Sequence, residues 1–177
     1  MDAVVEMKSP GVWVLGSILE KAREIGLGIV VEYAGNTGTP LWRDPASVTL
    51  DYTQFAHSAA SPEPDQTFVL TFRDIGPLNG SRFDTWTINN KYWPNRDLLT
   101  VEKGKRDRIA LRNGSGDQQP IHLHRHTFEL TRIGARQMSG LMKNVINIMP
   151  LGTAEVDFVA NNSGDTLIHC HQQLHMD

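Results

Sequence analysis

Near its end the sequence reads His169-Cys170-His171-Gln172-Gln173-Leu174-His175, and this stretch decides the fold prediction. It holds the only cysteine of the 177 residues, with a histidine on each side. In a strand, alternation places His169 and His171 on one face and Cys170 on the other. A thiolate among imidazoles is a ligand set for copper or zinc, or the basis of a thiol catalyst. The stretch therefore predicts β-structure with a possible metal centre on each face of one strand.

A second histidine cluster lies upstream, at His122-Leu123-His124-Arg125-His126. The two clusters contain six of the seven histidines. If the upstream cluster is also a strand, His122, His124 and His126 share one face. We expect His126 to support the ligands rather than to bind metal itself. The remaining histidine, His57, is expected to be an ordinary polar residue.

Composition limits the class of protein. The hydrophobic content of 40% and the charged content of 21% are typical of a globular domain. The formal net charge of -3 gives no basic footprint, so nucleic acid is not an expected partner. No apolar run approaches the roughly 20 residues of a membrane span, and the start of the chain does not resemble a secretory signal. One cysteine excludes an internal disulfide.

The hydrophobic pattern predicts an all-β fold, an antiparallel sandwich or barrel, because short strands recur between turn signals. Before residue 36 the pattern predicts a strand at 3–7, a short helix at 17–25 and a strand at 29–33. Residues 36–66 are rich in Gly, Pro and Ser without periodicity, which predicts a linker. The later strands are expected at 67–72, 85–88, 98–101, 108–112, 122–133, 144–148, 154–159 and 166–170.

Both histidine clusters resemble the C-terminal copper signatures of multicopper oxidases, the family that includes laccases, ascorbate oxidase and bilirubin oxidase. The resemblance implies a cupredoxin-like (plastocyanin-like) Greek-key β-sandwich over residues 67–177, truncated at its end. Residues 1–35 would be the tail of a preceding, copper-free cupredoxin domain. A weak internal repeat agrees with this: residues 11–19 align with 164–172, and non-ligand residues occupy the ligand positions.

The resemblance also implies a role for each ligand. His122 would bind a type 2 copper, and His124, His169 and His171 a type 3 pair. Cys170 and His175 would bind the type 1 copper and carry the catalytic electron transfer. Electrons from a small reducing substrate would pass from Cys170 through its neighbouring histidines to the trinuclear cluster, where oxygen is reduced to water.

This sequence departs from the family pattern. Gln119 stands where the family usually has another type 1 histidine, and a glutamine oxygen is a harder and weaker ligand. The axial residue usually follows the final histidine, but the chain stops at Asp177. The trinuclear cluster also needs histidines that this chain lacks, so missing N-terminal cupredoxin domains or other subunits are expected partners. The family implies a periplasmic or secreted parent protein.

Two other functions remain open. Gln119 motivates a non-catalytic or vestigial copper-binding cupredoxin module, because a weakened type 1 site relays electrons poorly. A zinc hydrolase or cysteine enzyme is also compatible with Cys and His ligands. We find no carboxylate placed as a general base and no oxyanion-hole motif, so copper-dependent oxidation is the preferred hypothesis.

Overall fold

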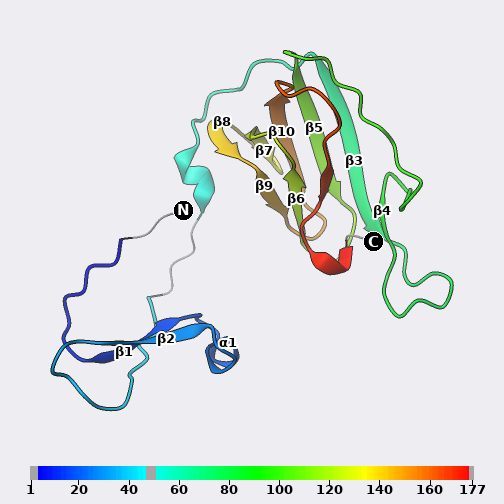
Figure 1. Ribbon diagram of the computed structural model, residues 1–177. Helices are drawn as coiled ribbons and strands as arrows, with labels where there is room; N and C mark the ends of the chain where they lie inside the picture. The colour runs from blue at the N-terminus through cyan, green and yellow to red at the C-terminus, as the bar shows by residue number, and fades with distance from the viewer. Residues whose placement is uncertain (1–3, 47–50, 176–177) are drawn as a thin grey trace. The chain divides into compact units, whose positions relative to one another are not determined.

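The computed structural model describes residues 4–46 and 51–175. The chain divides into two compact units, Met1–Leu50 and Asp51–Asp177 (Figure 1). The predicted linker, residues 36–66, spans this division. Among the described residues no helix has the length and apolar character needed to cross a membrane.

The first unit is a small hairpin. Strand β1 (Val12–Gly16) pairs antiparallel with β2 (Gly28–Glu32), and the short helix α1 (Glu20–Glu24) lies between them in sequence. Both β2 and α1 were expected. A Cβ on Gly16 would lie 2.6 Å from the Leu27 carbonyl oxygen, so the close crossing of the strands requires glycine there.

The strand predicted at residues 3–7 is wrong for 4–7, which have no regular structure; Ala3 lies outside the described residues. The apolar side chains of this segment are not buried by packing, since Val4 is fully exposed. The free edge of β1 is taken instead by Leu41, whose backbone exchanges hydrogen bonds with Val12 and Val14.

The second unit contains two sheets, which confirms the predicted all-β class. A six-stranded sheet has the order β4-β3-β5-β10-β7-β8, and a three-stranded sheet has the order β11-β6-β9. Every pair is antiparallel except β3 with β5. The strands are β3 (Gln66–Asp74), β4 (Trp86–Ile88), β5 (Arg106–Asn113), β6 (Gln119–Leu123), β7 (Phe128–Ile133), β8 (Arg136–Lys143), β9 (Val145–Ile148), β10 (Thr153–Val159) and β11 (Ile168–Cys170).

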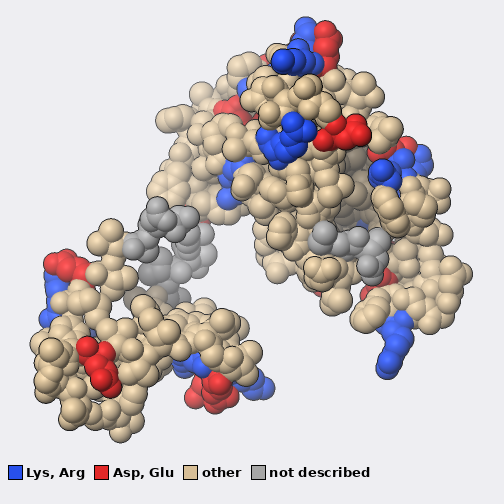
Figure 2. Space-filling model, viewed as in Figure 1, with Lys and Arg blue, Asp and Glu red and all other residues tan. Residues whose placement is uncertain are grey.

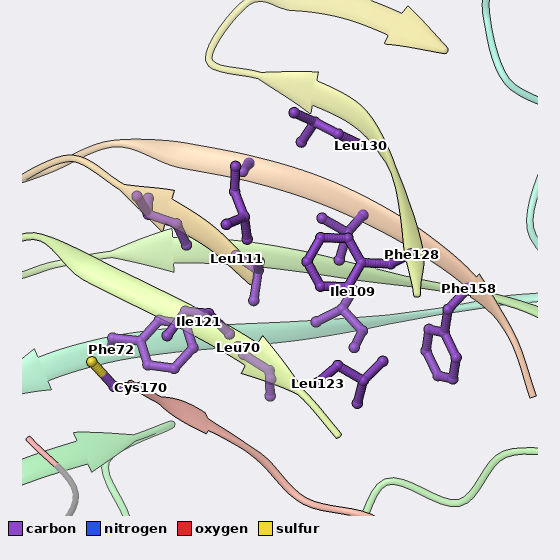
Figure 3. Packing of buried hydrophobic residues seen from close by; sticks show 14 of the residues in the cluster. Leu70, Phe72, Ile109, Leu111, Ile121, Leu123, Phe128, Leu130, Phe158 and Cys170 are labelled. Atoms are coloured by element: carbon purple, nitrogen blue, oxygen red, sulfur yellow. The ribbon is translucent and has the colours of Figure 1, made fainter. Parts of the chain in front are cut away.

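The core fills the space between these sheets. In β5 alternate residues are buried, and β10 presents buried residues opposite them. Leu130 and Ile146, from different sheets, are both 0% exposed. Figure 3 shows the cluster, with the Cys170 sulfur beside Phe72 at one end. Close packing of this kind fixes the orientation of β6 and β11, which carry the candidate ligands.

Two predicted strands need correction. The single strand expected at 122–133 is two strands, because Arg125 turns the chain with a φ of 62°. The strand expected at 98–101 is absent: Leu99 and Val101 pack on the core as an irregular segment. Sequence patterning also missed β8, which forms a hairpin with β7.

Residues 51–61 pack onto β8. The 3-10 helix η1 (Tyr52–Phe55) begins with Asp51, which accepts a hydrogen bond from the backbone N–H of Thr53. His57 exchanges two backbone hydrogen bonds with Ser139. These bonds join the segment that follows η1 to the edge strand β8.

An ion-pair network lies on the outer side of the large sheet. The Asp157 side chain is 0% exposed and accepts hydrogen bonds from Arg106 and from two nitrogens of Arg108. Glu129 pairs with Arg106 as well. Figure 2 shows basic and acidic side chains close together on the visible face of the second unit.

Candidate metal centres

Alternation along β11 separates the candidate ligands onto two faces. Cys170 is 6% exposed and points into the core, as Figure 3 shows. His169 and His171 extend from the other face. Strand β11 pairs with β6 so that His169 lies opposite His122 and Cys170 lies opposite Ile121. The pairing therefore joins the two histidine clusters of the sequence.

Four imidazole rings gather on the face opposite the thiol. The ring centroids of His122 and His124 are 4.7 Å apart, those of His124 and His169 5.0 Å, and those of His169 and His171 5.6 Å. The Nε2 atoms of His124 and His169 face each other at 2.9 Å. Burial and the three neighbouring imidazoles lower the pKa of His124, which favours the neutral, metal-binding form.

Backbone carbonyls fix the tautomer of two of these rings. His122 Nδ1 lies 2.6 Å from the Asn144 carbonyl oxygen, and His169 Nδ1 lies 2.7 Å from the Cys170 carbonyl oxygen. A carbonyl can only accept, so each Nδ1 carries the proton and each Nε2 keeps its lone pair. This is the usual arrangement behind a metal-binding histidine.

The donor set of this cluster fits copper, although the rings are not yet in chelating positions. Among the described residues no three His, Cys, Asp or Glu side chains converge as a finished metal site. A metal–nitrogen bond is about 2 Å, so the Nε2 atoms of His124 and His169 must separate to hold an ion between them. His124 is exposed and His169 is half-buried.

A second group of ligands surrounds the buried thiol. Cys170 Sγ lies 3.5 Å from His175 Nδ1, which lies 3.3 Å from Gln119 Oε1. His175 belongs to the 3-10 helix η2 (Gln173–His175) and is 8% exposed, and Gln119 is 1% exposed. A thiol sulfur, an imidazole nitrogen and an amide oxygen thus lie close together in a buried site, and this donor set also fits a copper ion.

Packing and charge shape the thiol site. Burial raises the pKa of Cys170, so the free site holds a neutral thiol and a metal must displace its proton. Burial also lowers the pKa of His175, against the opposing effect of Asp117 and Asp74. The Asp117 carboxylate lies 3.9 Å from His175 Nε2 and is largely exposed. Trp86 of β4 stacks on the His175 ring at 3.6 Å between centroids (η2 is red and close to β4 in Figure 1).

His126 does not share a face with His122 and His124, contrary to the sequence expectation. The turn at Arg125 moves it inward, where it is 8% exposed and packs edge-on against Phe158. Its Nδ1 donates to the His124 carbonyl oxygen at 3.1 Å. The ring lines a surface hollow of about 330 Å³ beside His122, outside the four-imidazole cluster.

Sequence reasoning missed three residues that contact the ligands. Trp86 stacks on His175, the Asn144 carbonyl oxygen contacts His122 Nδ1, and the Ser115 hydroxyl contacts Gln119 Nε2. All three reach the site through sheet pairing or loop packing, so local spacing carries no signal for them.

Comparisons with known proteins place this chain in a family. A family model described as multicopper oxidase matches residues 43–177. The chain belongs to the multicopper oxidase family. The multicopper oxidase MmcO of Mycobacterium tuberculosis is 28% identical over 170 residues, which cover 93% of this chain and 32% of that protein. A multicopper oxidase of Staphylococcus aureus is 30% identical over 66% of this chain and 26% of its own length.

Solved structures of multicopper oxidases share the fold. The blue copper oxidase of Nitrosomonas europaea superposes with a TM-score of 0.54 at 23% identity, over 62% of this chain and 38% of that one. Another multicopper oxidase gives 0.57 at 16% identity, over 65% and 41%. The predicted cupredoxin-like fold is confirmed. The chain spans about a third or less of the length of the mycobacterial and staphylococcal relatives.

Proposed function

We propose that residues 67–177 form the C-terminal copper-binding cupredoxin domain of a longer multicopper oxidase. The observation that carries the proposal is the alternation along β11, which points one thiol toward His175 and the adjacent imidazoles toward His122 and His124. Bound copper would supply one-electron oxidation of a small reducing substrate at the thiol site and reduction of oxygen to water at the imidazole cluster. The roles are those that the family resemblance implies: Cys170 and His175 for type 1 copper, His122 for type 2, and His124, His169 and His171 for the type 3 pair.

The residues of this chain ligate, set tautomers and connect the two sites. Cys170 is covalently adjacent to both His169 and His171. Its carbonyl oxygen also accepts the hydrogen bond from His169 Nδ1. A covalent route through each histidine, and a hydrogen-bonded route through His169 alone, therefore join the thiol to the imidazole cluster. Truncating His171 breaks one covalent route and removes one ligand, whereas truncating His169 also breaks the hydrogen-bonded route.

We infer that other cupredoxin domains or subunits supply the remaining cluster ligands. Four gathered imidazoles are fewer than a trinuclear site of this family uses. We also infer that residues 1–35 are the tail of a preceding copper-free domain and that 36–66 link it to the last one. The match to the mycobacterial relative supports a shared architecture, because it covers 93% of this chain and so extends beyond residues 43–177. A periplasmic or secreted location follows from the same resemblance.

Copper loading of the 177-residue chain tests the proposal. Absorption and electron paramagnetic resonance spectra would be compared for wild type, Cys170→Ser and His124→Ala. We expect Cys170→Ser to remove the thiolate-to-copper charge-transfer band and to leave the imidazole-bound copper signal. His124→Ala should do the reverse. If both substitutions alter both signals equally, or neither alters any, the two-site assignment is wrong.

The second candidate function is a copper-binding module without oxidase turnover. Gln119 favours it, because this buried amide stands where an imidazole would help to tune the redox copper. Rapid mixing of the copper-loaded chain with ferrous ion or hydroquinone separates the two functions. Bleaching of the charge-transfer band by either donor supports the oxidase domain. A loaded chain that retains its band with both donors supports the non-catalytic module.

A further inference from the structure

We propose that the carboxamide oxygen of Gln119 is itself a metal ligand, completing a Cys170–His175–Gln119 site, and that Ser115 and Asn113 position it. The inference rests on the proposed function, in which Cys170 and His175 bind a metal. In this proposal the third coordination position is filled rather than empty, because the Gln119 side chain is held with its oxygen toward His175.

Burial gives the Gln119 amide a restricted set of partners. The residue begins β6 and is 1% exposed, so both ends of its amide need partners from the protein. Within the described chain, the side-chain oxygen has one contact, His175 Nδ1 at 3.3 Å. The same imidazole nitrogen lies 3.5 Å from Cys170 Sγ. The amide oxygen and the thiol sulfur thus contact the same imidazole nitrogen, which is the arrangement that three ligands of one ion need.

Asn113 starts the chain of hydrogen bonds that orients this amide. Its Nδ2 lies 2.7 Å from the carbonyl oxygen of Asp117, 3.2 Å from that of Ile148 and 3.0 Å from that of Met149. Three carbonyls can only accept, so the NH2 group of Asn113 must face them. Its Oδ1 is then fixed as an acceptor toward Ser115.

Ser115 transmits this orientation to Gln119. Its hydroxyl has a single proton, which is donated to Asn113 Oδ1 at 2.7 Å. The contact of the hydroxyl with the Asp117 carbonyl oxygen is longer, at 3.2 Å. The serine oxygen is left as an acceptor, and Gln119 Nε2 lies 3.4 Å from it. The NH2 end of Gln119 is therefore turned to Ser115, and Oε1 is turned to His175.

The orientation matters because the two ends of an amide differ in chemistry. The carbonyl oxygen has lone pairs for a metal, whereas the NH2 group has none to offer. The resulting site combines a soft thiolate, an imidazole and a hard oxygen, a set that zinc, cobalt(II) and copper(II) accept. A flipped amide would present two hydrogens to the ion and exclude it.

Cobalt(II) titration of the 177-residue chain tests the inference, because its thiolate charge-transfer band reports only on an ion bound by Cys170. The variants are Gln119→Leu, Gln119→Glu and Ser115→Ala, with the exposed neighbour Gln118→Leu as matched control. We expect Gln119→Leu to weaken binding at least about 10-fold and Ser115→Ala about 10-fold, as for other residues that orient ligands. Gln119→Glu should tighten binding, and Gln118→Leu should change nothing.

The outcomes separate this inference from the function on which it rests. A wild-type chain without any thiolate band, indistinguishable from Cys170→Ser, overturns the proposed function as well. A normal band whose position, d–d intensity and affinity are unchanged in Gln119→Leu overturns the ligand role alone. If Gln119→Leu fails to fold by circular dichroism, Gln119→Glu decides: unaltered affinity and spectrum would refute the inference. A band that shifts in Gln119→Glu while Gln118→Leu matches wild type supports it.

Discussion

Replacing Trp86 by alanine should loosen the thiol site without disturbing the core. Trp86 lies on β4 and covers one face of the His175 imidazole, with 3.6 Å between ring centroids and an interplanar angle of 23°. The other contacts of this ring are made by its two nitrogen atoms, with Cys170 and Gln119 at Nδ1 and with Asp117 at Nε2, so the indole is the stacking partner that fixes the plane of the ring. The indole therefore holds the imidazole nitrogen toward Cys170.

The size of the effect follows from two contributions. A stacked aromatic pair contributes about 0.5–1.5 kcal/mol beyond its buried area. Freeing the imidazole restores rotamers, and fixing them again on binding costs about 0.5–1.5 kcal/mol. The sum is about 1–3 kcal/mol, which corresponds to a loss of metal affinity of about 5- to 140-fold at about 1.4 kcal/mol per factor of ten.

The assay is the cobalt(II) titration, followed at the thiolate band and at a temperature where the variant is folded by circular dichroism. Trp93→Ala is the control, since Trp93 is 64% exposed and stacks with Arg96 rather than with a ligand. Trp86→Phe should recover part of the affinity. An affinity of Trp86→Ala within about twofold of wild type would refute the idea that the stack positions His175.

Three further predictions concern stability. Asp157→Ala leaves two partly buried arginines without their shared carboxylate and should lower the free energy of unfolding in urea by about 3 kcal/mol. Folding lowers the pKa of His124 and of His175 below the ordinary 6.5, so the unfolded chain takes up protons at a higher pH than the folded one. The contribution of these two residues to the free energy of unfolding should therefore be at its maximum above pH 6.5 and decrease as the pH falls below it. The decrease, followed by urea unfolding at several pH values, should be less steep in His124→Asn. Gly140→Ala places a Cβ 2.5 Å from the His57 ring at a φ of 79° and should cost about 1–3 kcal/mol, of which the steric part disappears in a His57→Ala background.

Local spacing was enough to predict the central feature of the candidate site. The period of two along a strand separates Cys170 from His169 and His171 whatever the rest of the fold does. The same period, with turn signals between runs, was enough to predict the all-β class. These predictions depend on neighbours in sequence, which a single chain displays directly.

What the sequence did not reveal depends on contacts between distant segments. The break at Arg125 is a backbone conformation that its residue type does not favour, so the strand seemed continuous and His126 was assigned to the wrong face. The apolar residues at 98–101 resemble a strand, but Leu99 and Val101 pack on the core without a ladder partner. Trp86 and Ser115 reach the ligands only after the sheets have assembled.

Strand β11 has three residues and pairs with β6 at the margin of its sheet. Short marginal strands open by local unfolding at a far lower free energy than central strands such as β5. Peeling of β11 brings the Cys170 thiol to water, where it can lose its proton and meet an incoming ion. A metal that binds only the closed strand then raises the opening free energy in proportion to the logarithm of its concentration. Amide hydrogen exchange along β11 thus becomes a measure of metal occupancy.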